Sequence, residues 1–349
     1  MAGQTVCYDI IKRIREGIPS DSELKTKYLQ DQYRKIHGHP CFYEVTGEIT
    51  SILTDTGSPT EFSRFCKGID TPEKIIRIVL NEIDNRMSTH DYPRVSALIK
   101  HILPFGQQPW PEKEGANSFL SFRDLIEYTY YMATCEFGEE VTIGPFLQTD
   151  ILYHYGQLLC KTREYEQALP VLQEAERQNP VHAGILAELA EVLIRTSHQD
   201  QAQTLLQRSF SCAWVREDLV HAYQVQGLFF SLSGDYEAAI SCYLIAETWD
   251  DSAYRREKIE ALAQYAEHEI ESGYYNEHGR EILISHDLPY GPNPDIVSLI
   301  VEIADDYLDD HDFFKAREYL IRAHMLLMND ELEERIWRIE QFIDDQMDF

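Results

Sequence analysis

Residues 151–180 read ILYHYGQLLCKTREYEQALPVLQEAERQNP and contain the pattern that decides the fold. A small residue, Gly156, lies in the first half, and a second, Ala168, follows twelve positions later. We expect two antiparallel helices that cross where these small side chains meet, because larger side chains there would push the helices apart. The stretch therefore predicts a tightly packed helical hairpin.

The same frame recurs along the second half of the chain. Small residues twelve positions apart occur as Gly156 and Ala168, Ala190 and Ala202, Gly227 and Ala239, and Ala304 and Ala316. These positions, with the large residues around them, resemble the tetratricopeptide-repeat (TPR) family. The copies occupy residues 149–182, 183–216, 220–253 and 297–330, and a degraded copy is expected at 254–290. The resemblance implies that the hairpins stack into a superhelix.

The resulting fold prediction is all-α: an α-solenoid of stacked antiparallel helix pairs between an irregular helical N-terminal region and a C-terminal capping helix. Residues 1–103 form the N-terminal region, in which 75–103 has the length of one repeat but carries Ile83 and Val95 instead of small crossing residues. Residues 104–118, with three prolines and two glycines, are expected to be a linker. The repeat array then spans 119–330, and residues 331–349 cap it.

An aromatic-rich stretch, residues 119–137, is expected to be a helix. It is interpreted either as the first helix of a further irregular repeat or as a cap on the end of the regular array. Its tyrosines are assigned to packing, because large aromatic side chains mostly fill cores. Residues 139–148 are expected to be a loop.

Composition narrows the classes of function. The 349 residues include 60 acidic and 31 basic ones, giving a formal net charge of −29, so a nucleic-acid backbone would be repelled on average. No apolar run near the N-terminus is long enough for a signal peptide or membrane span. The seven cysteines are scattered without a C-x-x-C pair, and Cys160, Cys212 and Cys242 fall in expected helices as small apolar residues. These features predict a cytoplasmic protein that binds neither nucleic acid nor membrane.

A search for catalytic, cofactor or metal motifs finds none in a supporting context. The nearest metal candidate, His37, His39 and Cys41, matches no zinc spacing and is interpreted as a polar loop that ends a helix. Five aspartates between residues 305 and 312 lack the EF-hand pattern and are interpreted as a solvated acidic face. We therefore predict no catalytic residue, no metal site and no cofactor.

The resemblance also implies a binding surface, because the first helices of successive TPRs line a concave groove that holds a peptide. The frame assigns to this surface Tyr153, Gln157, Lys161, Ala187, Glu191, Arg195, Gln224, Leu228, Val301, Asp305 and Asp309. Lys161 and Arg195 hold equivalent places in adjoining repeats, so the groove is expected to be basic at one end and acidic at the other. Tyr153 and Gln157 replace the Lys and Asn of the chaperone-tail subclass, which argues against that ligand.

Three functions remain open at this point. The preferred one is a scaffold or adaptor without catalysis, which binds a protein or peptide partner in the groove. The alternative is an enzyme, or a regulatory subunit of one, whose N-terminal region carries the activity while the repeats recruit its substrate. A sensor that binds a small ligand is a third. The oligomeric state is not predicted, and stable release of an N-terminal fragment by proteolysis at 104–115 would favour the enzyme.

Overall fold

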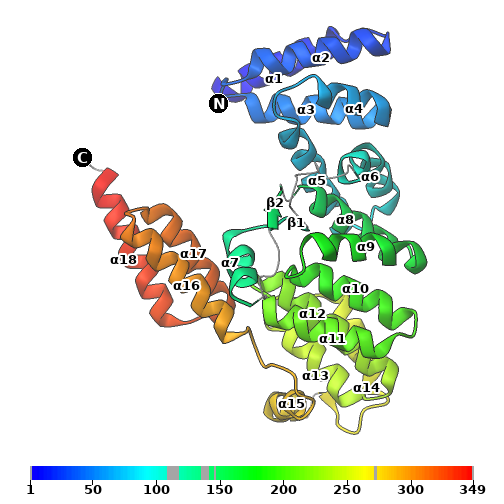
Figure 1. The fold of residues 1–349 in the computed structure, drawn as a ribbon, viewed down its shortest axis with the longest axis vertical. Coiled ribbons are helices and arrows are strands. Elements are labelled where there is room, and N and C mark those ends of the chain that lie inside the picture. Colours follow the sequence, from blue (N-terminus) through cyan, green and yellow to red (C-terminus); the bar gives the residue numbers. More distant parts are fainter. Residues whose placement is uncertain (1, 108–117, 135–140, 145–146, 271–272, 348–349) are drawn as a thin grey trace. The chain divides into compact units, whose positions relative to one another are not determined.

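The structure, a computed structural model, describes the chain except residues 1, 108–117, 135–140, 145–146, 271–272 and 348–349 (Figure 1). The described part contains 18 helices, which pack largely in consecutive pairs, and two strands of three residues each. None of the described helices combines the length and apolarity needed to cross a bilayer. The predicted all-α class and pairwise helix packing are confirmed.

Two compact units make up the chain. The first comprises Met1–Glu112 with Pro145–Val171, and the second comprises Lys113–Gly144 with Leu172–Phe349. Helix α9 (Tyr165–Gln178) begins in the first unit and ends in the second. The first regular repeat of the sequence, residues 149–182, is therefore shared between the two units.

The first unit is built from seven further helices around one apolar core that includes Leu29, Ile49, Phe62 and Ile76. The helices are α1 (Ala2–Glu16), α2 (Ser22–Ile36), α3 (Phe42–Asp55), α4 (Pro59–Lys67), α5 (Pro72–Ser88), α6 (Tyr92–Gly106) and α8 (Leu147–Lys161). Local sequence sets several starts. Ser58 accepts from the Glu61 backbone N–H while Glu61 accepts from that of Ser58, a capping box that fixes the first turn of α4. Helices α5, α6 and α8 pack successively on one another.

The second unit contains the remaining helices and both strands. Its helices are α7 (Leu125–Thr134), α10 (Ala183–Arg195), α11 (Gln199–Cys212), α12 (Arg216–Ser233), α13 (Tyr236–Glu247), α14 (Ala253–Ala263), α15 (Tyr274–Ser285), α16 (Pro294–Asp309), α17 (Phe313–Leu327) and α18 (Asp330–Met347). Strands β1 (Ser118–Leu120) and β2 (Val141–Ile143) pair in parallel, with Phe119 opposite Thr142. The pairs α10–α11, α12–α13 and α16–α17 are the most closely packed, and α12 also packs against α10.

Five helical hairpins share one turn geometry. Seven residues after each crossing position the backbone enters the left-handed region, at His90, Arg163, Ser197, Gly234 and His311, with φ between 60° and 83°. The next backbone N–H donates to the carbonyl five residues earlier, as Asp235 does to Phe230 at 3.0 Å. This is a Schellman motif, which satisfies carbonyls at the end of the first helix. The α5–α6 hairpin makes the same turn as the regular repeats, although the larger residues Ile83 and Val95 stand at its crossing.

The crossing residues are buried, as the spacing predicts. Gly156 and Gly227 are buried, and Ala190 and Ala304 are fully buried. At Gly227 an added Cβ would lie 2.9 Å from two ring carbons of Tyr243, closer than a carbon contact allows. A small residue is thus required where α12 crosses α13.

We expect Gly227→Ala to lower the free energy of unfolding by about 1–2 kcal/mol, because the buried Tyr243 ring has no space to yield to the new methyl group. Gly279, also buried in a helix, provides the matched control, since a Cβ there would meet only Ser241 Oγ at 3.8 Å. Gly279→Ala should be neutral or stabilising, by up to about 1 kcal/mol, because alanine favours helix. Urea unfolding of both variants measures the difference, and equal effects would contradict close helix contact at Gly227.

The degraded repeat and the last pair depart from regular stacking. Helices α14 and α15 both pack on α13, and the connector after α15 is held to α12 by Tyr223, whose hydroxyl donates to Pro289 O at 2.7 Å and accepts from Gly291 N at 3.0 Å. In the described residues α16 packs on α17 and α7, with no comparable packing on α14 or α15. The expectation that the last hairpin stacks on the degraded repeat is therefore wrong, because this connector separates them.

Two predicted boundaries also need correction. Helix α6 continues through Pro104 to Gly106, so the proline interrupts only the last residues of the helix. Residues 108–117 of the predicted linker lie outside the described residues. In the aromatic stretch, the described residues are helical from Leu125 to Thr134, and Phe119 belongs instead to β1. Part of the predicted loop at 139–148 forms β2 and the start of α8.

Candidate functional site

The residues assigned to a binding surface lie on four helices. Tyr153, Gln157 and Lys161 are on α8 of the first unit, and the others are on α10, α12 and α16 of the second. Each helix is the first of its hairpin, as the repeat frame requires. The pairing of Lys161 with Arg195, which joins the two units, stays a prediction.

Helices α10 and α12 bring four of the predicted residues onto neighbouring helices. We call Glu191, Arg195, Gln224 and Leu228 the α10/α12 face. Arg195 Nη2 lies 3.3 Å from Glu191 Oε1, one helical turn away, so its charge is already partly matched. Gln224 and Leu228 are half-buried, and Arg195 is exposed, whereas Ala187 is fully buried. The face thus offers a charge pair, an amide and an apolar side chain.

A buried carboxylate lies between the same two helices. Glu188 of α10 has no exposed surface, and its Oε2 lies 3.2 Å from His221 Nε2 of α12. Neither Glu188 oxygen accepts a hydrogen bond of acceptable geometry from a described residue. Buried carboxylates usually accept several. Glu188 therefore retains acceptor capacity at the junction of α10 and α12.

Asp305 and Asp309, which are predicted to form the acidic end of the groove, both lie on α16. Asp305 forms an ion pair with Arg335 of α18, and Asp309 is exposed near the end of α16. Val301 is half-buried. Helix α16 packs on α17 and α7, and α17 packs on α18. In the described residues, α16 has no comparable packing on α14 or α15. The acidic face is thus partly neutralised from within the chain.

A buried polar network, which the sequence did not predict, centres on Glu127 of α7. Glu127 Oε2 accepts from the Arg123 backbone N–H at 2.8 Å and from Asn179 Nδ2 at 2.7 Å. Its Oε1 accepts from Arg123 Nε and from Trp214 Nε1, the latter at 3.2 Å. Charge-assisted hydrogen bonds of this kind are stronger than neutral ones. One carboxylate thus joins α7 to the two loops that precede α10 and α12.

The same segment continues the network to α12 and α17. Arg123 Nη2 donates to Asp218 Oδ2 at 2.7 Å, while Asp124 accepts from the Tyr319 hydroxyl at 3.0 Å and from Arg322 Nη1 at 2.8 Å. Burial disfavours the charge on Arg123, but Asp218 and Glu127 outweigh that effect and raise its pKa. The residues 123–127 therefore connect the central hairpins to the last one through ion pairs.

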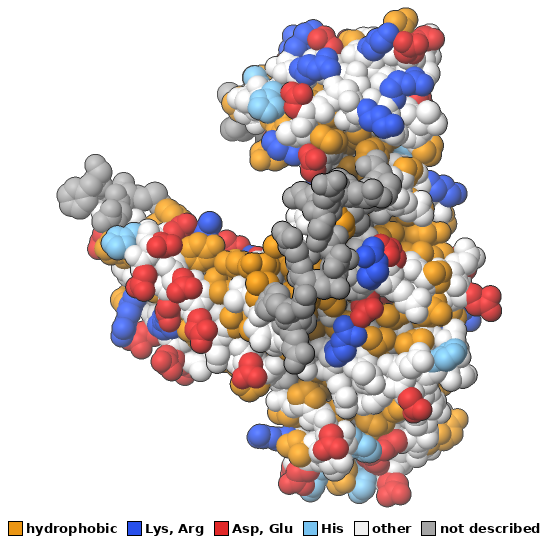
Figure 2. All heavy atoms as spheres, in the orientation of Figure 1, with side chains coloured by type: hydrophobic (Ala, Val, Ile, Leu, Met, Phe, Trp, Pro, Cys, Tyr) orange, Lys and Arg blue, Asp and Glu red, His pale blue; other side chains and the backbone are white. Residues whose placement is uncertain are grey.

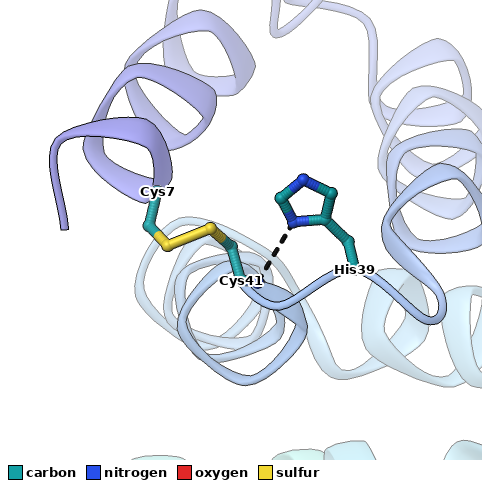
Figure 3. The surroundings of a disulfide bond; sticks show 3 residues. All are labelled: Cys7, His39 and Cys41. Carbon is teal, nitrogen blue, oxygen red and sulfur yellow. Dashed lines mark hydrogen bonds between the residues drawn. A yellow bond between two sulfur atoms is a disulfide. The ribbon is translucent and has the colours of Figure 1, made fainter. Parts of the chain in front are cut away.

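The residues considered as a metal site, His37, His39 and Cys41, are arranged differently: Cys41 is part of a disulfide. Cys41 forms a disulfide with Cys7, joining α1 to the start of α3, and the Cys41 backbone N–H donates to His39 Nδ1 at 3.1 Å (Figure 3). The Cys41 sulfur is thus already bonded, a pairing that the scattered cysteine spacing does not predict. Cys160, Cys212 and Cys242 are buried in helices, as expected. Within the residues that the structure describes, no group of three or more potential ligands could hold a metal ion.

A buried charged histidine stabilises the first unit. His154 of α8 lies between two carboxylates, with Nε2 2.8 Å from Asp84 Oδ1 and Nδ1 3.2 Å from Asp150 Oδ1. Burial disfavours the imidazolium, but the hydrogen bonds and charges of Asp150 and Asp84 outweigh it and raise the pKa of His154 to about 10. His154 is therefore protonated at neutral pH and ties α8 to α5.

Comparisons with known proteins do not identify a family. No protein-family model matches the sequence, and a search of curated proteins gives no match. Function must therefore be argued from the residues of this chain.

Proposed function

We propose that this protein is a TPR-type interaction protein without catalysis of its own, which binds a peptide segment of a partner protein on the α10/α12 face. The observation that carries the proposal is the packing of α10, which holds Glu191 and Arg195, against α12, which holds Gln224 and Leu228. An extended peptide needs amide partners for its backbone, apolar surface for its side chains and charges for its orientation. This face offers all three.

Two further observations support the proposal. The five hairpins with one turn geometry are the arrangement expected of a TPR array, including the α5–α6 pair that lacks small crossing residues. The charge pair Glu191–Arg195 gives such a peptide a direction, because its acidic side chains would be drawn to Arg195 and its basic ones to Glu191.

The proposal is tested by selecting 12-residue peptides from a random phage-displayed library on the full-length protein. The affinity of each selected peptide is then measured by fluorescence anisotropy with wild type, Leu228→Asp and Arg195→Ala. We expect Leu228→Asp to weaken binding about tenfold or more, because an anchor residue is lost and an unpaired charge is introduced. Arg195→Ala should weaken the binding of peptides that contain acidic residues, by a smaller factor than Leu228→Asp.

Arg177→Ala is the matched control. Arg177 of α9 pairs with Glu174 at 2.7 Å within its own helix, much as Arg195 pairs with Glu191, but it lies on the second helix of a hairpin. This variant should bind the selected peptides within about twofold of wild type, because exposed charge pairs contribute little. The proposal fails if no peptide is enriched, or if the enriched peptides bind Leu228→Asp as tightly as wild type.

A further inference from the structure

The turn between α16 and α17 and the second half of α18 enclose a hollow of about 670 Å³. We call it the Phe314 hollow; its lining includes Asp310, Asp312, Phe313, Phe314, Phe342 and Ile343. The ring centroids of Phe313 and Phe342 lie 4.4 Å apart, so α17 and α18 form its apolar floor together. Its size falls within the range of pockets that hold ligands or anchoring side chains.

The hollow leaves large apolar side chains in contact with water. Phe314 is 65% exposed and Phe342 43% exposed, although the terminal helix of a repeat array ordinarily presents a polar outer face. Clustered apolar side chains rimmed by polar ones are typical of interaction sites. Other side chains fill the core of the α16–α17 hairpin, among them Ile303 and Leu320, which are buried.

The charge around the hollow determines what it would accept. Asp309 and Asp310 are exposed, and in the part of the chain that the structure describes neither forms an ion pair. Acidic side chains greatly outnumber basic ones over α16 to α18, at the left of Figure 2. An anionic ligand would be repelled there, and so would a second copy of this chain, with its net charge of −29. The complementary occupant is cationic.

We propose that the Phe314 hollow binds a cationic peptide segment of a partner protein. An aliphatic or aromatic side chain of the peptide enters beside Phe314 and Phe342, and flanking Lys or Arg side chains meet Asp309 and Asp310. Apolar contact provides most of the affinity, while the acidic rim selects the sign of the partner's charge and speeds its approach. This site is separate from the α10/α12 face and does not depend on a ligand there.

The test uses a fluorescein-labelled, 14-residue amphipathic peptide of leucine and lysine, and a second peptide in which serine replaces leucine at equal charge. Anisotropy titrations of the full-length protein should show tighter binding of the leucine peptide. Phe314→Ser, which leaves the net charge unchanged, should weaken it about tenfold, the loss expected for one anchoring aromatic side chain. Phe342→Ser provides a second such variant, and circular dichroism verifies that both remain folded.

Two controls distinguish binding in the Phe314 hollow from non-specific electrostatic attraction of the peptide to an acidic protein. Tyr43→Ser removes a 77% exposed aromatic side chain from α3 and should leave binding unchanged. Asp309→Asn with Asp310→Asn should weaken binding and reduce its salt dependence more than Glu257→Gln with Glu260→Gln, an equal change of charge at exposed positions of α14.

The proposal is overturned if Phe314→Ser and wild type bind the leucine peptide equally, or if the two double variants lose binding equally. It is also overturned if sedimentation shows a wild-type dimer that Phe314→Ser dissociates, since the occupant would then be a second copy. Loss of binding in Leu228→Asp, with Phe314→Ser unaffected, would likewise overturn it and assign the leucine peptide to the α10/α12 face.

Discussion

Glu127→Ala is expected to lower the free energy of unfolding by about 3–5 kcal/mol, the loss typical of breaking a buried ion pair by removing one partner. The change leaves Asn179 Nδ2, Trp214 Nε1 and two N–H groups of Arg123 without their shared acceptor. Asn179 has no exposed surface, so bulk water does not reach it in the folded protein. Urea unfolding, followed by circular dichroism and tryptophan fluorescence, measures the effect.

Glu334→Ala is the matched control for this prediction. Glu334 pairs with Arg338 at the same four-residue spacing as Arg123 and Glu127, but both residues of this pair are exposed. Its loss should cost less than about 1 kcal/mol. Glu127→Ala combined with Arg123→Ala should cost less than the two single changes added together, because a charge and its counter-charge leave together. Equal losses for Glu127→Ala and Glu334→Ala would show that the network contributes little.

The free energy of unfolding is expected to fall as the pH rises from about 6.5 to about 10, with His154 responsible for the slope. Because the pKa of His154 is raised from 6.5 to about 10 in the folded protein, folding binds a proton throughout this interval. The stabilisation is complete below pH 6.5 and is lost as the pH passes through the folded pKa. Between the unfolded and the folded pKa of His154, linkage predicts that the free energy of unfolding falls by about 1.4 kcal/mol per pH unit.

His154→Gln isolates this contribution. The variant should be less stable than wild type at pH 6 and should lose the part of the slope that His154 causes. The comparison is clearest between pH 6.5 and 8.5, because burial raises the pKa of the Cys66, Cys212 and Cys242 thiols and adds a further loss at higher pH. Parallel profiles of unfolding free energy against pH for the two proteins would contradict a charged, buried His154.

The helical hairpins could be predicted from the sequence because their determinants are local. Gly227 and Ala239 mark a crossing, and Ser233, Gly234 and Asp235 mark the turn, so spacing alone locates both helices. The α5–α6 hairpin was harder to assign, since Ile83 and Val95 hide the crossing while the backbone at His90 retains the turn. A turn made by a non-glycine residue at positive φ leaves little trace in the sequence.

The departures from regular stacking and the Glu127 network could not be predicted, because both depend on contacts between distant parts of the chain. Arg123 and Asp218 are 95 residues apart, and Asp124 and Arg322 are 198 apart. The available signal is the placement of Arg123 and Glu127 four residues apart in an otherwise aromatic segment, of which only the tyrosines receive an assignment from the sequence. Charges inside an apolar stretch need partners, and the sequence does not say where those partners are.

The Glu127 network also limits how the gene can be truncated. A recombinant fragment that begins at residue 149, where the repeat periodicity becomes regular, would lack Arg123, Asp124 and Glu127. The fragment would still contain their hydrogen-bond partners, which would then lose these bonds: Asp218, Asn179, Trp214 and Arg322. The repeats visible in the sequence are therefore not a self-sufficient module, and a shorter version of the second unit should retain residues 118–144 as an integral part.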